Sequence, residues 1–359
     1  MASEITAGRS YVIRNRKGGY VLNVAGNGTN PSAKIDTWDL QTNHDRNSQL
    51  WHLFPLDQGS FLIVNKNSGQ VLNVVGNSSA ASTRLEQYPL QSAPEAMQTW
   101  MLRPAPGGGY FVVNKRSGLY MNIQGNDPAN GRVEQYHYQN GADAAQVWDL
   151  EVEDEYKSVL DLAHIVTDPA DVGDVLRLTG FRQPTKKQTD AVLIGQAAVP
   201  FPLVQDPALS RDRQAQESPY YLLKRHGYWS LVYYFEHSGS SEYTKSQEVK
   251  VGLTTTNSRE VESTVGISVT AEASFSYGGF SGSLSATLSA ELKVTTSSSS
   301  TQESTRTDTV SRTYAAGKRA SEAIWYKEDR YTLERLDGTK VTEWTVRDSD
   351  TVISDGYSG

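Results

Sequence analysis

The chain has 359 residues, of which 21% are charged, and its formal net charge is −7. This length is sufficient for two domains with separate cores. The mildly acidic balance argues against nucleic-acid binding, because affinity for phosphate requires clustered Lys and Arg. The chain has no cysteine, which excludes disulfides, thiol catalysis and Cys-ligated metals.

The N-terminus, Met1 to Ile5, has neither a basic n-region nor an apolar h-region. We therefore expect no ordinary signal peptide. No run of 18 apolar residues occurs, so we expect no membrane-spanning helix.

The first 150 residues contain a threefold repeat. The blocks IRNRKGGYVLNVAGN, IVNKNSGQVLNVVGN and VVNKRSGLYMNIQGN begin at Ile13, Ile63 and Val112. Each repeat closes with Gln-x-Trp, at Gln49/Trp51, Gln98/Trp100 and Gln146/Trp148. Short alternating runs between Gly, Asn and Pro turn signals predict strands throughout.

Three in-register copies of this pattern resemble the ricin-type β-trefoil lectin domain, over roughly residues 5–152. We expect the motif Trp side chains to fill the pseudo-threefold core and the motif Gln side chains to satisfy buried backbone groups. We therefore assign these six residues a structural role and place a trefoil domain at residues 1–152.

In ricin-type domains an aromatic ring stacks on the sugar while acids and amides bond its hydroxyls. The resemblance places the aromatic residues at Trp38, Tyr88 and Tyr136, and the acids at Asp36, Glu86 and Glu134. Asn23, Asn73 and Asn122 stand where a galactose site of the family has Asp, and Ser48, Met97 and Ala145 stand where it often has Asn. Two readings stay open: repeats that bind sugar, or repeats kept for folding with one weak or altered site.

The second half carries another signature, Pro-Tyr-Tyr-Leu-Leu-Lys-Arg-His-Gly-Tyr-Trp, ending at Trp229. After a trefoil, this arrangement resembles the Bin-like (Tpp) insecticidal crystal toxins, in which such a strand opens an aerolysin-like pore-forming domain. The resemblance implies a bacterial crystal toxin that acts on insect gut epithelium. The short C-terminal tail leaves open whether a second toxin component is required.

Aromatic residues are dense in this region, at Tyr220, Tyr221, Tyr228, Trp229, Tyr233 and Tyr234. A half-buried aromatic strand is the simpler interpretation. Contact with a membrane interface is the alternative, because Tyr and Trp also suit that boundary. Upstream, the segment 157–165 is expected to form a short helix before Pro169.

An alternating segment at about residues 262–296 predicts a membrane-insertion hairpin. Its two strands place apolar side chains on one face and Ser, Thr, Glu and Lys on the other, and Gly278-Gly279 matches a two-residue turn. The proposed insertion residues are Val265, Ile267, Val269, Phe275, Tyr277, Gly278, Gly279, Phe280, Leu284, Leu288, Leu292 and Val294. The alternative is that this hairpin packs one face on a soluble sheet core.

Polar stretches flank the hairpin at Ser246–Glu262 and Thr295–Thr313, and 13 of the 19 residues in the second are Ser or Thr. Aerolysin-type proteins are similar in that Ser/Thr-rich strands bracket a stowed hairpin. One hairpin alone would expose unpaired backbone groups, so several copies must close a barrel. Beyond the hairpin, Asp337-Gly338 predicts a type I′ turn between two further strands.

No signature of catalysis is found. The six His residues form no His-Glu-x-x-His, no Gly-x-Ser-x-Gly elbow occurs, and no Gly run continues into a phosphate loop. We therefore expect no enzyme, no cofactor and no metal.

The sequence thus predicts an all-β protein, a β-trefoil followed by an elongated antiparallel aerolysin-like domain at residues 153–359. The expected function is an insecticidal β-pore-forming toxin, stored in a crystal inclusion or released without a signal peptide. Its expected partners are a cell-surface glycan or glycosylated receptor, the insect midgut membrane and further copies of itself, as a monomer or dimer in solution and a homo-oligomer in the pore. The alternative is a non-lytic lectin whose second domain only oligomerises.

Overall fold

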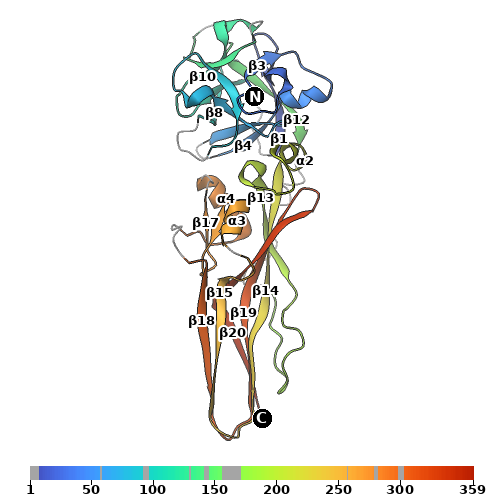
Figure 1. The fold of residues 1–359 in the computed structure, drawn as a ribbon, viewed down its shortest axis with the longest axis vertical. Helices are drawn as coiled ribbons and strands as arrows, with labels where there is room; N and C mark the ends of the chain where they lie inside the picture. The colour runs from blue at the N-terminus through green and yellow to red at the C-terminus, as the bar shows by residue number, and fades with distance from the viewer. Residues whose placement is uncertain are drawn as a thin grey trace. The chain divides into compact units, whose positions relative to one another are not determined.

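The computed structural model describes residues 8–56, 59–91, 97–128, 131–140, 145–155, 171–256, 258–278, 282–297 and 303–359. The chain divides into two compact units (Figure 1). The first comprises residues 1–161, 200–221 and 281–284, and the second comprises residues 162–199, 222–280 and 285–359. In the part of the chain that the structure describes, no helix is both long and apolar enough to cross a membrane.

Unit 1 contains a β-trefoil, as the threefold repeat predicts. Its three repeats each contribute four strands to one 12-stranded sheet. The strands are β1 (Arg9–Asn15), β2 (Val21–Val24), β3 (Ile35–Trp38), β4 (Leu50–Pro55), β5 (Ser60–Asn65), β6 (Val71–Val74), β7 (Thr83–Tyr88), β8 (Thr99–Pro104), β9 (Tyr110–Asn114), β10 (Tyr120–Ile123), β11 (Val133–Tyr136) and β12 (Val147–Glu155). Short 3₁₀ turns recur after the second strand of each repeat, η1 (Ala25–Asn27), η4 (Val75–Asn77) and η5 (Gln124–Asn126), and η2 (His44–Gln49) precedes β4.

The Gln-x-Trp motifs have the predicted structural role. Trp51, Trp100 and Trp148 are fully buried in one hydrophobic cluster. Their indole N–H groups donate to the carbonyl oxygens of Leu22, Leu72 and Met121 at 3.0, 2.9 and 3.2 Å. Each motif Gln accepts from one backbone N–H and donates to one backbone carbonyl of the preceding loop. The motif therefore joins the core to the loop that it closes.

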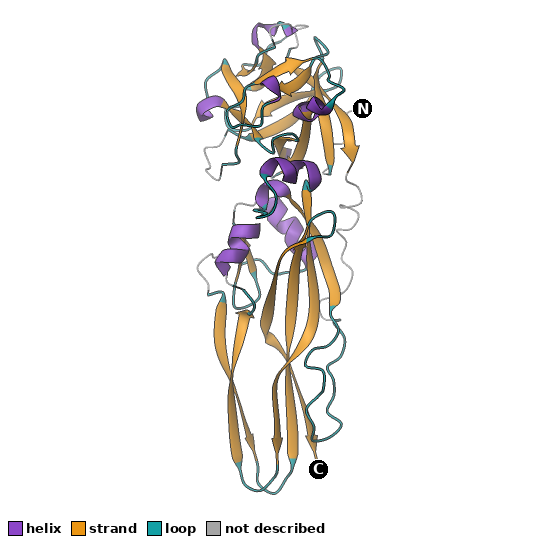
Figure 2. Ribbon diagram, turned by 45° about the vertical axis from the view of Figure 1, so that its right-hand side comes forward, coloured by secondary structure: helices purple, strands orange, loops and turns teal. Residues whose placement is uncertain are grey.

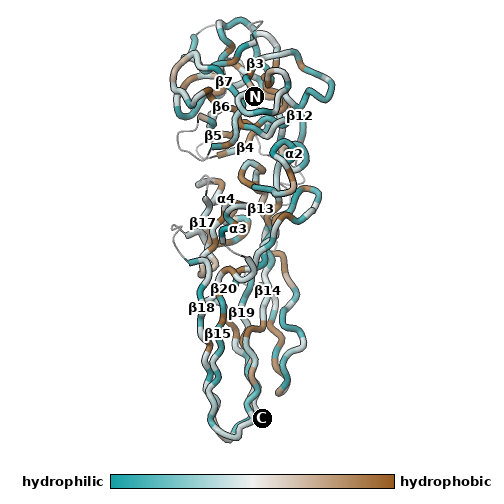
Figure 3. The backbone as a smooth tube through the Cα atoms, viewed as in Figure 1, coloured by the Kyte–Doolittle hydropathy of each residue, from teal (hydrophilic) through white to brown (hydrophobic). Residues whose placement is uncertain are grey.

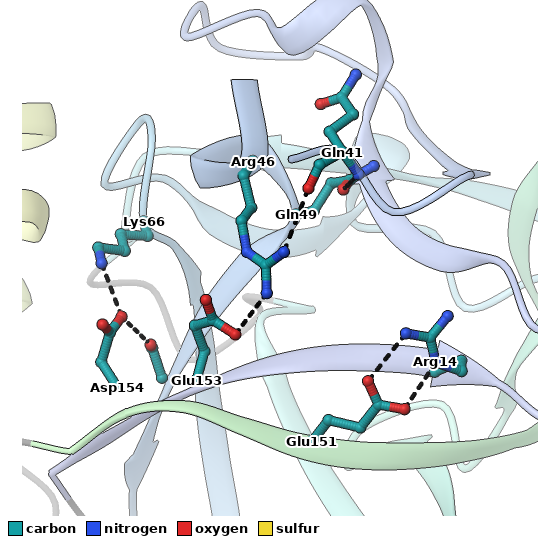
Figure 4. Close-up of polar contacts among 9 residues, drawn as sticks. Arg14, Gln41, Arg46, Gln49, Lys66, Glu151, Glu153 and Asp154 are labelled. Carbon is teal, nitrogen blue, oxygen red and sulfur yellow. Dashed lines mark hydrogen bonds and ion pairs between the residues drawn. The ribbon is translucent and has the colours of Figure 1, made fainter. Parts of the chain in front are cut away.

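Acidic residues of β12 connect the last strand to the first half of the trefoil (Figure 4). Glu151 accepts two hydrogen bonds from Arg14 of β1, and Glu153 forms an ion pair of 2.6 Å with Arg46 of η2. Asp154 binds Lys66 at 2.7 Å. These contacts span about a hundred residues of sequence and add to the β1–β12 ladder that closes the domain.

Residues 200–221 also belong to unit 1, although they follow the trefoil in sequence. They form η7 (Phe201–Leu203) and α2 (Arg211–Glu217). Phe54 of β4 packs edge-to-face against Phe201 and Tyr220, with ring centroids 5.7 and 5.3 Å apart. The Nε2 atom of buried His52 is 2.9 Å from the Ala215 carbonyl oxygen. The trefoil thus extends its apolar core to this segment.

Unit 2 is built on a six-stranded sheet in the order β13-β14-β19-β20-β15-β18, whose neighbours from β14 to β18 pair antiparallel. Its strands are β13 (Val192–Pro200), β14 (Tyr220–His237), β15 (Tyr243–Leu253), β18 (Thr305–Tyr314), β19 (Ala320–Glu334) and β20 (Lys340–Ser358). Figure 2 shows these long strands running side by side, with β15 and β18 as a separate ribbon along part of their length. β15 pairs with β20 only at Gly252 and Leu253.

The aromatic residues at Tyr220–Tyr234 fill the interior rather than the surface. Tyr221 and Tyr233 are fully buried, and Trp229 packs in a cluster with Ile194 and Trp325. The simpler interpretation of this region, an aromatic core strand, therefore holds for β14.

The predicted type I′ turn at Asp337-Gly338 is wrong in detail. These residues do join two strands, β19 and β20, but Arg335 N–H donates to the Thr339 carbonyl at 2.9 Å across a three-residue loop. Only Gly338 has a positive φ, 83°, whereas type I′ requires two such residues. The extra residue places glycine at the left-handed position after a type I turn.

The predicted hairpin at residues 265–294 is also different in this structure. The chain between β15 and β18 forms α3 (Ser258–Val265), β16 (Ile267–Val269), β17 (Phe275–Tyr277) and α4 (Gly282–Leu292). β16 turns at Thr270–Ser274 to pair with β17, so the turn is not at Gly278. Gly279 and Phe280 lie outside the described residues, as does the helix expected at residues 157–165.

The segment predicted as the returning strand forms the helix α4, because the spacing of its leucines suits a helix as well as a strand. Leu284, Leu288 and Leu292 lie four residues apart, which places them on one face of a helix as well as on one face of a strand. Ala286 and Ala290 between them are exposed and favour the helical state. Alternation alone could not distinguish these two conformations.

Candidate functional sites

The candidate sugar-binding residues form a polar pair in every trefoil repeat. Asn23, Asn73 and Asn122 lie opposite Asp36, Glu86 and Glu134 in their hairpins. Each Asn amide donates to its acid, at 2.8, 3.1 and 3.3 Å respectively. Asn therefore serves as a donor that holds the carboxylate, which an Asp at the same position could not do when ionised.

Pockets lie beside the candidate residues of repeats 1 and 2. Asp36 and Trp38 line a pocket of about 330 Å³ in repeat 1, and Asn73, Glu86 and Tyr88 line one of about 350 Å³ in repeat 2. Trp38 is 54% exposed, whereas Tyr88 and Tyr136 are half-buried. Repeat 1 therefore presents the largest free aromatic face for a sugar ring.

A serine distinguishes repeat 1 from the other two. The Ser48 hydroxyl lies 3.1 Å from Asn23 Oδ1 and 2.7 Å from Asn27 Oδ1. Met97 and Ala145 at the equivalent positions have no hydroxyl. Asn73 Oδ1, Asn122 Oδ1 and Asn126 Oδ1 are buried and have no hydrogen-bond partner in the part of the chain that the structure describes. The three repeats therefore have unequal polar networks.

The carboxylates differ as well. Burial raises the pKa of Asp36 and of Glu134, and the amide bonds from Asn23 and Asn122 oppose that rise. Glu86 instead has both oxygens engaged, because Lys34 Nζ lies 2.9 Å from Oε2. Repeat 2 thus has little free acceptor capacity for a sugar hydroxyl.

The candidate insertion residues, which except for Leu284 belong to unit 2, turn most of their apolar side chains inward. Val265, Ile267, Val269 and Phe275 are buried, as are Leu288 and Leu292 of α4. Tyr277, Leu284 and Val294 are half-buried, and Gly278 is exposed. Phe275 packs against Tyr331 of β19 with ring centroids 4.9 Å apart. In this structure these side chains therefore contribute to a soluble core.

The strands on either side of this segment share one register. β15 and β18 pair from Tyr243↔Tyr314 to Gly252↔Thr305 without a shift. If the same pairing were continued beyond Gly252↔Thr305, Val265 would lie opposite Leu292 and Gly278 would lie opposite Gly279. The β15–β18 ladder therefore has the register of a hairpin that turns at Gly278-Gly279.

The alternation of side chains between the two faces of the β15–β18 ladder also continues into the candidate insertion segment. The buried side chains of β15 are at odd positions, Val249, Val251 and Leu253, as are the apolar residues from Val265 to Tyr277. On the opposite face Ser246 and Ser311 bond through their hydroxyls at 2.9 Å, and Figure 3 shows the outer part of this ribbon as hydrophilic to neutral.

Arg225 holds the end of α4. Its guanidinium donates to the Leu292 carbonyl at 2.9 Å, to the Lys293 carbonyl, and to Asp329 of β19. A cation at this position also interacts favourably with the negative end of the helix dipole. The role of Arg225 could not be predicted from the sequence, because no local pattern indicates a contact between residues 67 positions apart.

Comparisons with known proteins agree with both halves of this description. Residues 192–359 match the family model described as insecticidal crystal toxin, P42. Residues 3–88 and 96–164 match the model of ricin-type β-trefoil lectin domain-like proteins. The chain thus joins a region that matches the lectin domain model to a region that matches the insecticidal crystal toxin model. Both matched families are non-enzymatic.

One of the similar solved structures shows the same fold over nearly the whole chain. The crystal structure of Cry35Ab1 covers 98% of the toxin and 91% of its own chain, with a TM-score of 0.74 and 17% identity. The designed threefold-symmetric protein ThreeFoil is 27% identical over 40% of the toxin and 99% of its own chain, with a TM-score of 0.37. The Rhizoctonia solani agglutinin is 18% identical over 43% of the toxin and 100% of its own chain, with a TM-score of 0.36. No curated protein sequence matches the chain.

Proposed function

We propose that this toxin forms β-barrel pores in insect midgut membranes after its trefoil docks on cell-surface glycans. The observation that supports the proposal is one of register. The β15–β18 ladder pairs its residues in the same register as a hairpin that would turn at Gly278-Gly279. Because the register is shared, residues 254–304 can extend into the existing ladder without breaking any β15–β18 pair. The extension replaces α3, β16, β17 and α4 by two strands.

The extended hairpin has the side-chain pattern of a membrane strand pair. A transmembrane strand needs about 9–11 residues with lipid-facing and lumen-facing side chains alternating. Its lipid face would carry Val265, Ile267, Val269, Leu284 and Leu288, and its lumen face would carry Glu272, Glu291 and Lys293. Since one hairpin leaves two unpaired edges, several copies must close the barrel.

The lectin domain supplies the target in this proposal. Exposed Trp38 above the Asn23–Asp36 pair supports docking on a glycan or a glycosylated receptor. The toxin would reach the gut from a crystal inclusion as a monomer or dimer and assemble into a ring at the membrane. The trefoil domain at residues 1–152 and the pore-forming domain at residues 153–359 would act in that order.

Two neighbouring residues of α4 offer a direct test. Ala286 and Thr287 are both exposed in the soluble fold, but the extended hairpin turns Ala286 toward lipid and Thr287 toward the lumen. A lysine on the lipid face costs about 2–4 kcal/mol per copy near the bilayer midplane. We expect Ala286→Lys to abolish dye release from vesicles made of gut membrane, and Thr287→Lys to preserve it.

Both variants should keep the thermal stability of the parent, because both positions face solvent. Equal release by the two variants would contradict the insertion assignment. Intact vesicles with the unmodified toxin, and no rings by electron microscopy, would favour the alternative of a non-lytic lectin.

A further inference from the structure

A ring of charged residues connects the three trefoil repeats. A cation stands two positions before each candidate acid, as Lys34-x-Asp36, Arg84-x-Glu86 and Arg132-x-Glu134. Each cation lies opposite the acid of another repeat: Lys34↔Glu86, Arg84↔Glu134 and Arg132↔Asp36. If the ring were symmetric, every site would have one acid paired with one cation.

The pairing is not symmetric. Lys34 forms an ion pair of 2.9 Å with Glu86. Among the described residues, neither Arg84 nor Arg132 has a carboxylate within ion-pair distance. Within the described part of the chain, the Arg84 guanidinium makes a single long hydrogen bond of 3.5 Å, to the Ile35 carbonyl. Both guanidiniums therefore keep most of their donor capacity.

These two guanidiniums lie in one pocket. Arg84 and Arg132 line the pocket of repeat 1 together with Asp36, Asp39 and Trp38. Burial lowers the pKa of Arg84, and the positive charge of Arg132 lowers it further. Two guanidiniums that have no ion-pair partner among the described residues thus line the same pocket as the exposed ring of Trp38.

Two acids also line this pocket, but among the described residues neither forms an ion pair with Arg84 or Arg132. Asp36 instead accepts a hydrogen bond from the Asn23 amide. Asp39 is exposed to solvent. Planar guanidiniums recognise carboxylate and sulfate groups through paired N–H donors, and such charge-assisted bonds are about twice as strong as neutral ones.

We infer that the repeat 1 pocket binds a sugar carrying an anionic substituent, with Trp38 stacking on the ring and Arg84 and Arg132 binding the anion. This inference rests on the proposed glycan docking and adds the chemical class of the glycan. Lys34, already paired with Glu86, gives the repeat 2 pocket no such preference.

The test is titration calorimetry of the full toxin with one disaccharide in three forms: neutral, sulfated and sialylated. We expect tighter binding of the anionic forms, and the stronger of the two distinguishes a sulfate from a carboxylate source. Arg132→Gln should lower the ratio of anionic to neutral affinity by about 10- to 100-fold. Arg84→Gln should act in the same direction.

Lys34→Gln is the matched control, because it removes a cation of the same ring outside this pocket, and it should retain the preference. Trp38→Ala should weaken binding of all three forms. Equal affinity for the three forms, or a preference that survives Arg132→Gln, would overturn the inference. If the unmodified toxin still released dye from vesicles, the proposed pore formation would hold although the inference about an anionic glycan had failed. The failure of this inference can therefore be distinguished from the failure of the proposed function.

Discussion

Arg225 and Asp329 form a buried ion pair between adjacent strands, with Nη2 2.5 Å from Oδ2. The same guanidinium donates to the last carbonyls of α4. Breaking a buried pair by removing one partner typically costs about 3–5 kcal/mol, because the remaining charge is left uncompensated. This pair therefore connects the stability of the sheet to the docking of the segment proposed to insert.

Replacing this pair should separate the two roles of Arg225. We expect Arg225→Met to lower the free energy of unfolding by about 3–5 kcal/mol. The double variant Arg225→Met/Asp329→Leu should recover most of that stability while leaving the α4 carbonyls without their donor. Hydrogen exchange should then be faster in residues 282–292 than in β19. Unchanged protection of α4 in the double variant would refute the role of Arg225 as its anchor.

Gly195 permits the close approach of α4 to β13. A Cβ at Gly195 would lie 2.2 Å from the Glu291 carbonyl oxygen, a backbone atom that cannot move without the helix. We expect Gly195→Ala to destabilise the stowed segment by about 1–3 kcal/mol and to speed its proteolysis. Gly180→Ala is the matched control, because its Cβ would meet nothing within 4 Å. Equal proteolysis of the two variants would count against a tight α4–β13 contact.

Glu291 makes the stowed state sensitive to pH. Burial raises the pKa of Glu291 from 4.5 to about 7, against the hydrogen bond from the Ala198 backbone. Between these two values the folded state keeps a proton that the unfolded state has lost, so stability falls as pH rises from about 4.5 to 7 and is level above. Because the side chain is only half-buried, we expect a loss of about 1–2 kcal/mol.

Denaturant unfolding at pH 5 and pH 8 measures this loss. Glu291→Gln carries no titratable proton and should reduce the difference between the two pH values by that amount. An unchanged difference in the variant would show that other groups cause the pH dependence.

The unequal repeats predict a stabilising substitution. Ala145 is fully buried at the position equivalent to Ser48, whose hydroxyl lies near Asn23 Oδ1 and Asn27 Oδ1. In repeat 3, Asn122 Oδ1 and Asn126 Oδ1 have no hydrogen-bond partner among the described residues. Ala145→Ser should donate to one of them and raise the free energy of unfolding by about 0.5–1.5 kcal/mol. Ser48→Ala, the reverse change in repeat 1, should lower it by about 1–3 kcal/mol. Thermal unfolding of both variants checks this, and a destabilised Ala145→Ser would mean that the hydroxyl does not fit.

The trefoil could be predicted from sequence because its evidence is local and repeated. Trp51, Trp100 and Trp148 recur in register, and each occupies the core position that its motif implies. The charged ring had a signal too, since Lys34, Arg84 and Arg132 recur at the same offset, but the unequal pairing of the three cations depends on contacts between repeats.

The insertion segment could be predicted only in part. Its alternation identifies an apolar face, which the structure buries, but Leu284, Leu288 and Leu292 suit a helix equally well. The turn after Val269 could not be predicted, because Ala271 and Ala273 continue the alternation of apolar and polar residues through it. The state that forms depends on side chains of distant strands, such as Arg225 and Tyr331, which a local pattern cannot reveal.

A disulfide between β16 and β17 tests the central claim most directly. Ser268 and Ser276 face each other in the stowed form, where paired Cα atoms lie about 5.5 Å apart, within the range for a disulfide. In the extended hairpin they belong to one strand and lie about 26 Å apart. The toxin has no natural cysteine to interfere. Ser246→Cys/Ser311→Cys is the control, because those residues pair in both forms.

The measurement is conductance of planar bilayers carrying gut-membrane receptors. We expect the oxidised Ser268→Cys/Ser276→Cys toxin to give no discrete steps and the reduced form to give them, while the control pair conducts in both states. Discrete steps of normal size from the oxidised Ser268→Cys/Ser276→Cys toxin would contradict the extension of this segment into a membrane hairpin.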